Sequence, residues 1–131
     1  MNEELRQDIV HHQMQSARTC MDEVLYLRQG DFFNAAMARL YYACFHAASA
    51  LLIAYAFESK THNGVRTILG KEFVQTGKIS PELGRFYTKL FNKRQDGDYD
   101  NFIFFDDTDL EEFYPQAVIF IEAIEKIIQS R

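Results

Sequence analysis

The sequence has few of the features that mark fibrous, secreted or membrane proteins. It contains two prolines and six glycines among 131 residues, which excludes a collagen-like or low-complexity chain, and no internal repeat indicates a solenoid. The longest apolar stretch, residues 43–57, is interrupted by His46 and Ser49 and is shorter than the ~18 to 20 residues of a membrane span. The first residues lack the basic and apolar segments of a secretion signal.

Cysteine is also scarce. The two cysteines, Cys20 and Cys44, both fall within expected helices. This placement is typical of reduced, packed thiols, although a disulfide between them is an open alternative. Together with the missing membrane and secretion segments, it predicts a cytoplasmic protein that does not associate with a membrane.

The apolar content predicts a compact fold. Hydrophobic residues make up 47% of the chain, and a chain of this length buries about two thirds of the surface that it exposes when unfolded. We expect a single domain over residues 1–131.

The spacing of apolar residues predicts an all-α fold, an up-and-down bundle of four long helices and one short helix. The helices are expected over residues 3–28, 32–57, 61–74 (the short one), 80 to 94 or 99, and 108–129. The second of these has apolar residues at steps of three and four, and seven alanines between positions 35 and 50 allow neighbouring helices to approach closely.

Turn and capping residues predict where these helices begin and end. Gly30 is expected to end the first helix, and Asp31 to cap the second. The other expected starts are Thr61, Ser80 before Pro81, and a capping box formed by Thr108 and Glu111. Pro115 predicts a kink or a later start of the last helix, and residues 102–105 are compatible with a short extended segment.

Charge is distributed unevenly along the chain. The net charge is −5, but residues 60–94 hold eight basic and two acidic side chains, whereas residues 95–112 hold eight acidic and no basic ones. A locally basic surface is therefore expected on a globally acidic molecule.

Six residues of the basic segment are candidates for binding a nucleotide or RNA. Arg85, Lys89 and Lys93 follow each other at steps of four, which places them on one face of a helix where they could follow phosphates. The remaining three, at or near the start of the short helix, are Lys60, His62 and Arg66. The alternative in both cases is an ordinary solvated surface.

Arg39, Tyr42 and His46 form a polar stripe on the otherwise apolar second helix. Polar groups in a core helix need hydrogen-bond partners. We expect these three to be buried and to fix the register of the helices, with a catalytic role for His46 as the alternative.

Three segments together resemble the HEPN family of small all-helical domains. They are residues 39–48, residues 60–65, and the run Arg94-Gln95-Asp96-Gly97-Asp98-Tyr99. The resemblance extends over residues 20–127. Many HEPN proteins are metal-independent ribonucleases with an arginine, four to six variable residues and a histidine, contributed by both subunits of a dimer.

The resemblance identifies Arg94, Asp98 and Tyr99 as candidate catalytic residues, with one departure from the ribonuclease motif. Arg94 matches the arginine, but Tyr99 stands where the histidine would be. A phenol with an ordinary pKa near 10 is a poor base at neutral pH compared with imidazole at about 6.5. The sequence therefore resembles a branch of the family that is non-catalytic or of undetermined activity, and whether the protein is an enzyme stays open.

An acidic run, residues 96–107, has some of the spacing of a calcium-binding loop. Its sixth position is Asn101 instead of glycine, and its last is Asp107, whose side chain is too short for the usual bidentate contact. We expect no metal site and no cofactor.

Three functions follow as hypotheses. The resemblance implies a homodimeric binding module, one component of a two-gene toxin–antitoxin system with a nucleotidyltransferase partner that modifies Tyr99. The alternatives are a metal-independent endoribonuclease, in which His46 or His62 assists Arg94, and a nucleotide-binding protein without turnover, with Lys60, His62, Arg66 and Arg94 around the ligand.

Overall fold

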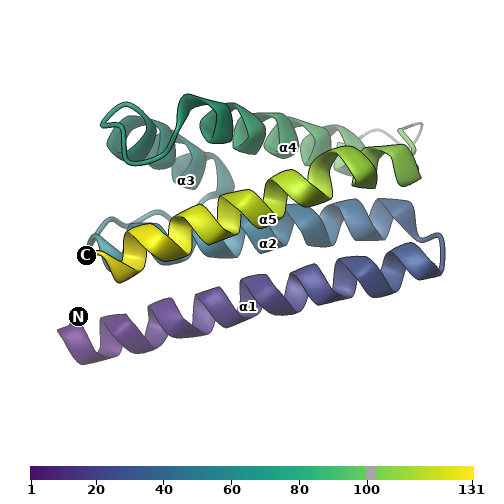
Figure 1. Cartoon of the computed structure of the whole chain (residues 1–131). Helices are drawn as coiled ribbons and strands as arrows, with labels where there is room; N and C mark the ends of the chain where they lie inside the picture. Colours follow the sequence, from purple (N-terminus) through teal and green to yellow (C-terminus); the bar gives the residue numbers. More distant parts are fainter. Residues whose placement is uncertain (100–102) are drawn as a thin grey trace.

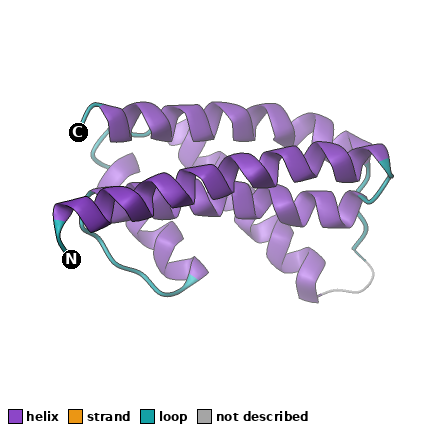
Figure 2. Cartoon of the chain, turned by 90° about the horizontal axis from the view of Figure 1, so that it is seen from below, coloured by secondary structure: helices purple, strands orange, loops and turns teal. Residues whose placement is uncertain are grey.

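The computed structural model describes residues 1–99 and 103–131, and for residues 96–99 it describes the backbone alone. Its elements are α1 (Glu3–Gln29), α2 (Phe33–Ala54), α3 (His62–Ile68), the π-helical turn η1 (Leu69–Val74), α4 (Pro81–Tyr99) and α5 (Asp107–Gln129). Every regular element of the described chain is a helix (Figure 2). The predicted all-α bundle is confirmed.

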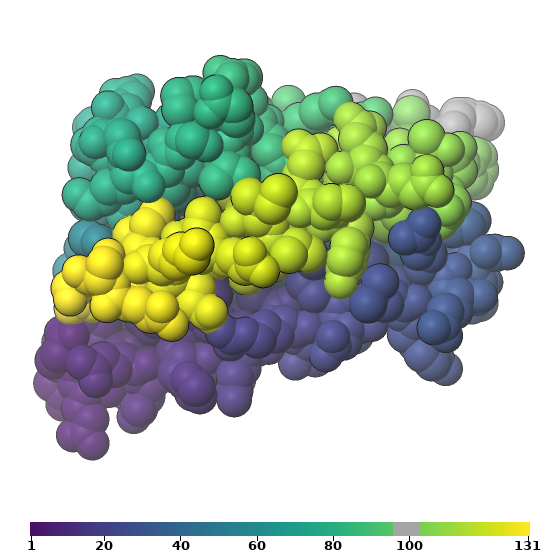
Figure 3. Space-filling view, viewed as in Figure 1, coloured from purple at the N-terminus to yellow at the C-terminus, as the bar shows by residue number. Residues whose placement is uncertain are grey.

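The central helix of the bundle is α2, which contacts α1, α3, α4 and α5. Helices α1 and α2 form a long antiparallel pair, and α5 and α4 lie on the other side of α2 (Figure 1). Figure 3 shows α5 crossing one face of the molecule between α1 and the part formed by α3 and α4. The two termini lie at the same end of the bundle (Figure 1).

The alanines of α2 make this central position possible. Ala36, Ala43, Ala47, Ala48 and Ala50 are completely buried, so neighbouring helices pack closely on several sides of α2. By length and hydropathy α2 would also be long enough to cross a membrane, but 61% of its most apolar window is buried inside the bundle. Its apolar character is that of a core helix.

The expected third helix, residues 61–74, is divided into two parts. Thr61 caps α3 as predicted, because its Oγ1 accepts a hydrogen bond of 2.9 Å from the Gly64 nitrogen. The chain then widens into η1, where the Gln75 nitrogen bonds to the carbonyl of Gly70, five residues earlier, at 2.9 Å. This turn was not predicted, because a single π turn shifts the apolar spacing by only one residue.

The predicted caps of α2 and α5 are wrong. Asp31 has a φ of +62° and belongs to the turn after Gly30, and α2 begins at Phe33 without a side-chain cap. The capping box of α5 is formed by Asp106 and Asp109, two residues before the predicted pair. The start of α5 is set by the preceding loop, because the Phe105 nitrogen bonds to Asn34 Oδ1 at 2.8 Å.

The remaining helix ends, and Pro115, can also be compared with the predictions. Gly30 ends α1 and Ser80 caps α4, both as predicted. Helix α2 ends at Ala54, earlier than predicted, because Ala56 adopts a φ of +65°. Helix α5 continues through Pro115.

Candidate functional site

A cluster of aromatic rings lies where α2, α3 and α4 meet, and we call it the aromatic cluster. Its centre is Tyr41, which is completely buried. The rings around it, with centroids 5.5 to 6.2 Å from that of Tyr41, are Tyr42, Phe45, His62, Tyr87 and Phe91. The cluster joins three helices and provides a rigid support for polar groups at its edge.

Arg94 lies on the aromatic cluster. Its Nη2 donates a hydrogen bond of 2.9 Å to the Tyr42 hydroxyl, and its guanidinium carbon lies 5.3 Å from the ring centroids of both Tyr41 and Tyr42. Cations are attracted to aromatic faces at such distances. The position of Arg94 is therefore fixed by α2, and the side chain is only half-buried.

His62, the first residue of α3, lies on the same cluster. Its Nδ1 shares a hydrogen bond of 2.8 Å with the Tyr41 hydroxyl, and its ring stacks on Phe45 with centroids 4.2 Å apart. Tyr41 thus contacts both His62 and Arg94. The structure brings together a histidine and the arginine of the HEPN-like motif, 32 positions apart in the sequence.

His46 faces α1 instead. Its Nδ1 lies 2.8 Å from Gln13 Oε1. Burial, and the nearby charges of Arg39 and His12, lower its pKa, so the neutral ring is favoured in the folded protein. Of the two histidines considered from the sequence, His62 is the one that shares Tyr41 with Arg94.

The stripe of Arg39, Tyr42 and His46 is half-buried, so the prediction that these residues are buried is corrected. Arg39 lies over the Tyr42 ring at 5.0 Å and 3.9 Å from a Glu23 carboxylate oxygen. The stripe is not fully buried because Tyr41, the residue next to Tyr42, is the one that faces the core.

The buried tyrosines are not suited to act as bases. Burial raises the pKa of Tyr41 above its ordinary value, although Arg94 lies nearby. Burial raises the pKa of Tyr87 further, with the neighbouring Tyr41 adding to the effect. Both hydroxyls therefore stay protonated at neutral pH, and Tyr41 positions His62 by hydrogen bonding.

The other basic candidates are distributed over different surfaces. Arg66 reaches the aromatic cluster, with its guanidinium 5.0 Å from the Phe91 centroid. Lys60 lines a separate hollow with Phe57, and its predicted grouping with the Arg94 site stays a prediction. Lys93 is half-buried beside Arg94 in sequence.

The remaining two members of the predicted stripe, Arg85 and Lys89, are exposed and lie near carboxylates. Arg85 is 3.5 Å from Glu82, and Lys89 is 2.8 Å from Glu112 on α5. Exposed pairs of this kind contribute little to stability. These two residues do not contact the aromatic cluster in any of the described interactions.

Asp98 and Tyr99 lie in the last turn of α4, but their side chains are outside the described residues. Their predicted roles therefore stay predictions. Of the calcium-like run of residues 96–107, residues 100–102 and the side chains of residues 96–99 also lie outside the described part of the chain. Among the residues that are described, no three His, Cys, Asp or Glu side chains are grouped as metal ligands.

Three members of the site were missed by the sequence analysis. Tyr41 contacts His62 and Arg94, and Phe45 stacks on His62. Phe91 packs against Tyr41, yet none of the three was a candidate. The sequence did contain a signal for two of them: Tyr41 and Phe45 are four residues apart, next to the polar stripe, and therefore share one face of the helix.

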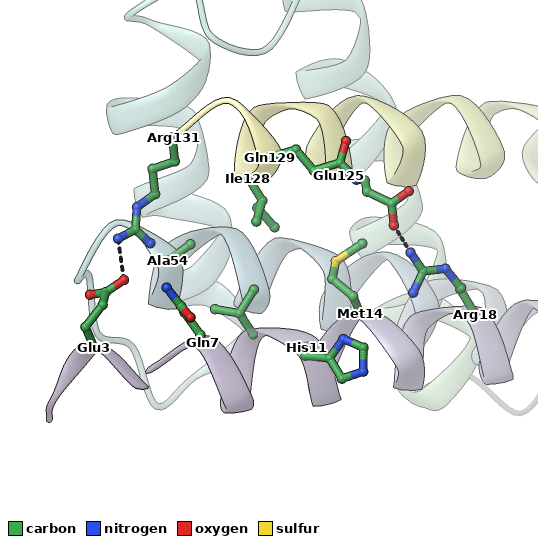
Figure 4. Close-up of a pocket in the computed structure, with 11 residues that line it drawn as sticks. Glu3, Gln7, His11, Met14, Arg18, Ala54, Glu125, Ile128, Gln129 and Arg131 are labelled. Carbon is green, nitrogen blue, oxygen red and sulfur yellow. Dashed lines mark hydrogen bonds and ion pairs between the residues drawn. The ribbon is translucent and has the colours of Figure 1, made fainter. Parts of the chain in front are cut away.

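A second hollow, of about 560 Å³, lies between α1 and α5 at the end of the bundle that holds the termini (Figure 4). Two ion pairs lie beside it: Glu3 of α1 with Arg131, which follows α5, at 2.8 Å, and Arg18 of α1 with Glu125 of α5. No candidate residue from the sequence lines it.

Comparison with known proteins gives consistent matches along almost the whole chain. A family model described as HEPN domain matches residues 10–127. The chain is 36% identical over 130 residues to a UPF0332 protein of Thermotoga maritima, covering 99% of this chain and 97% of that protein. Two proteins of Methanocaldococcus jannaschii carry the name "putative toxin". One is 30% identical over 133 residues, covering 99% of this chain and 96% of the relative. The other is 30% identical over 105 residues, covering 80% and 71%.

Proposed function

Because the chain belongs to the HEPN domain family, we propose that it is the toxin-like component of a two-gene system. In this proposal it forms a homodimer through the face that carries Arg94 and pairs with a nucleotidyltransferase. The names of the two relatives from Methanocaldococcus jannaschii support the toxin-like role.

The observation that carries the proposal is the fixed position of Arg94. A half-buried guanidinium held by the Tyr42 hydroxyl and by two aromatic rings is ordered before any ligand binds. Ordering a binding group in advance reduces the entropy lost on binding. Arg39, Arg66 and His62 contact rings of the same cluster. The site suits a phosphate next to an aromatic base.

Exposed aromatic side chains support an association with another protein. Tyr26, Phe32 and Phe104 are 76%, 63% and 78% exposed. They lie near the turn between α1 and α2, where Asn34 holds the loop that leads into α5. Aromatic residues are enriched in protein interfaces, and we propose that this end of the bundle contributes to the contact with a partner.

The first test concerns the toxin-like role and the partner. Induced expression is expected to arrest growth, and Arg94→Ala is expected to relieve the arrest, whereas Lys78→Ala, at an exposed basic residue that is no candidate for binding, is the control. Co-expression with an adjacent nucleotidyltransferase gene is expected to give a complex and, by mass spectrometry, a nucleotide adduct on Tyr99. Equal growth of cells with the wild type and Arg94→Ala would refute the toxin-like role, and the absence of both complex and adduct would refute the partner.

The contact of Tyr41 with both His62 and Arg94 favours a second candidate, a metal-independent endoribonuclease. In this reaction the ribose 2′-hydroxyl attacks the adjacent phosphate, His62 accepts the hydroxyl proton, and Arg94 stabilises the negative charge of the transition state. The bond between phosphorus and the 5′-oxygen breaks, and the leaving oxygen takes up through water the proton that His62 accepted, so the products are a 2′,3′-cyclic phosphate and a free 5′-hydroxyl.

Purified protein tests this second candidate directly. We expect cleavage of RNA in the presence of a chelator, abolished in Arg94→Ala and His62→Gln and retained in His46→Gln. RNA that stays intact from pH 5 to 9 would refute the enzyme. If the protein is nevertheless stabilised against heating by a nucleotide, the third function, binding without turnover, is supported.

A further inference from the structure

The hollow between α1 and α5 has no part in the proposed function, and we call it the α1–α5 hollow. One face of α1, the last turns of α5 and Ala54 at the end of α2 line it. Its volume is about 560 Å³, and sites for small molecules in proteins usually measure about 300 to 1,000 Å³. By size it is suited to a small ligand.

The α1–α5 hollow lies away from Arg94. Ala54, the last residue of α2, lines the hollow, whereas the guanidinium of Arg94 lies against Tyr42 of the same helix. The two α2 residues are 12 positions apart, which is about 18 Å along the helix axis. A ligand in the hollow would therefore occupy a site separate from the aromatic cluster.

The inner part of the hollow is apolar. Met14 points from α1 toward α5, and Ile128 points from α5 toward α1 (Figure 4). Val10 and Ala54, which also line the hollow, are buried members of the core. Surfaces of this kind hold the apolar body of a ligand, because its transfer out of water is favourable.

The two ion pairs limit the length of a ligand. Glu3 pairs with Arg131 at one end of the hollow, and Arg18 pairs with Glu125 at the other (Figure 4). A helix or an extended peptide that followed the hollow would have to break these pairs, whereas a small molecule fits between them. The arrangement favours a small molecule over a segment of a protein.

The same pairs favour a neutral ligand. The carboxylates and guanidiniums that line the hollow neutralise each other in the two pairs, so a charged ligand would have to separate a pair to find a counter-charge. The other polar side chains of the lining are Gln7 and His11 of α1 and Gln129 of α5, all exposed to solvent. A primary amide both donates and accepts hydrogen bonds, so the two glutamines suit a ligand that also does both.

We propose that the α1–α5 hollow is a binding site for a small neutral molecule with a compact apolar body and a carboxamide group. The apolar body lies between Met14 and Ile128, and the carboxamide bonds to Gln7 or Gln129. This site goes beyond the proposed function, because Arg94 and the aromatic cluster take no part in it.

Three probes with the same ring test the chemical class of the ligand. Benzamide has the apolar ring and the carboxamide, benzoate replaces the carboxamide by a charge, and toluene lacks hydrogen-bonding groups. The measurement is an NMR titration that follows the methyl group of Met14. The methyl group of Met37, which is buried and does not line the hollow, is the internal reference.

We expect benzamide to shift the Met14 signal, with saturation and a Kd of about 1 mM, which is reasonable for a ligand of this size. The Met37 signal should stay in place. Benzoate and toluene should bind at least about fivefold more weakly, because benzoate meets no unpaired cation and toluene forms no hydrogen bond.

Variants test the roles of the amides and of the ion pairs. Gln7→Ala or Gln129→Ala should weaken benzamide binding about fivefold, whereas Gln15→Ala, the same change at an exposed glutamine of α1 outside the hollow, should not. These exposed helix positions accept alanine without loss of folding. Glu125→Gln leaves Arg18 without its carboxylate partner, so it should strengthen benzoate binding about two- to fivefold.

Four outcomes would overturn the inference. The Met14 signal could show no saturable shift with benzamide up to about 20 mM. Benzoate could bind as tightly as benzamide, which would contradict the neutral class. Toluene could bind as tightly as benzamide, which would leave an apolar hollow without specificity. Finally, both Gln7→Ala and Gln129→Ala could bind benzamide as the wild type does.

Discussion

The bond between Arg94 and Tyr42 leads to a quantitative prediction. Tyr42→Phe removes the hydroxyl that accepts the bond of 2.9 Å from Arg94 but keeps the ring 5.3 Å from the guanidinium. Hydrogen bonds to charged groups contribute about 1.5 to 3 kcal/mol. Because both side chains are half-buried, solvent screens the bond, and we expect a loss below this range, about 1 kcal/mol of unfolding free energy.

Urea denaturation measures this loss. With an m value of about 2 kcal/mol/M, the midpoint should fall by about 0.5 M. In an Arg94→Met background, the same change of Tyr42 should have almost no effect, because the donor is already absent; the difference between the two backgrounds gives the coupling energy. Tyr26→Phe, at a side chain that is 76% exposed, serves as control and should leave the midpoint unchanged.

An equal loss in both backgrounds would refute this account of the site, because the hydroxyl would then stabilise the fold without Arg94. The functional proposals would be weakened by the same result, since they depend on an arginine held in place before ligand binding.

Three further predictions concern the fold. Gly84→Ala should lower the melting temperature, with a cost of about 1 to 3 kcal/mol, because its Cβ would lie 2.9 Å from Val74 Cγ2. Asp106→Ala should cost about 1 kcal/mol by removing the capping box, whereas Thr108→Ala should be nearly neutral in the same urea titration. The lowered pKa of His46 favours the neutral ring in the folded state. Its contribution to stability is therefore present above pH ~6.5 and is lost as the pH falls below that value. His46→Gln should make the unfolding free energy less dependent on pH between about 7 and 5, and an unchanged pH profile would contradict this account.

The sequence was sufficient for the helices and for most of their ends, because periodicity and capping are local properties. Gly30, Thr61 and Ser80 act as predicted. The errors arose where the tertiary structure decides: Asp31 lies in a left-handed turn, and the start of α5 is set by a contact with Asn34, 71 positions from Phe105.

The candidate site shows the same limit. The sequence singled out Arg94 and His62, but it did not show that both contact Tyr41, because that arrangement depends on how α2, α3 and α4 pack. Burial of the polar stripe was overestimated for a related reason. Tyr41 lies in the core and its neighbour Tyr42 at the edge of the core. Which of the two faces inward depends on how α2 is rotated about its axis, and the spacing of residues in the sequence does not fix that rotation.

The close packing around α2 also limits how this protein can diverge. In a library that substitutes every position, replacements of Ala43, Ala47 or Ala48 by larger residues should be depleted, whatever the chemistry of the new side chain, since a longer side chain there would push a neighbouring helix outward. Such constraints act independently of ligand binding. Distant homologues that bind different ligands should therefore still carry small residues along this helix.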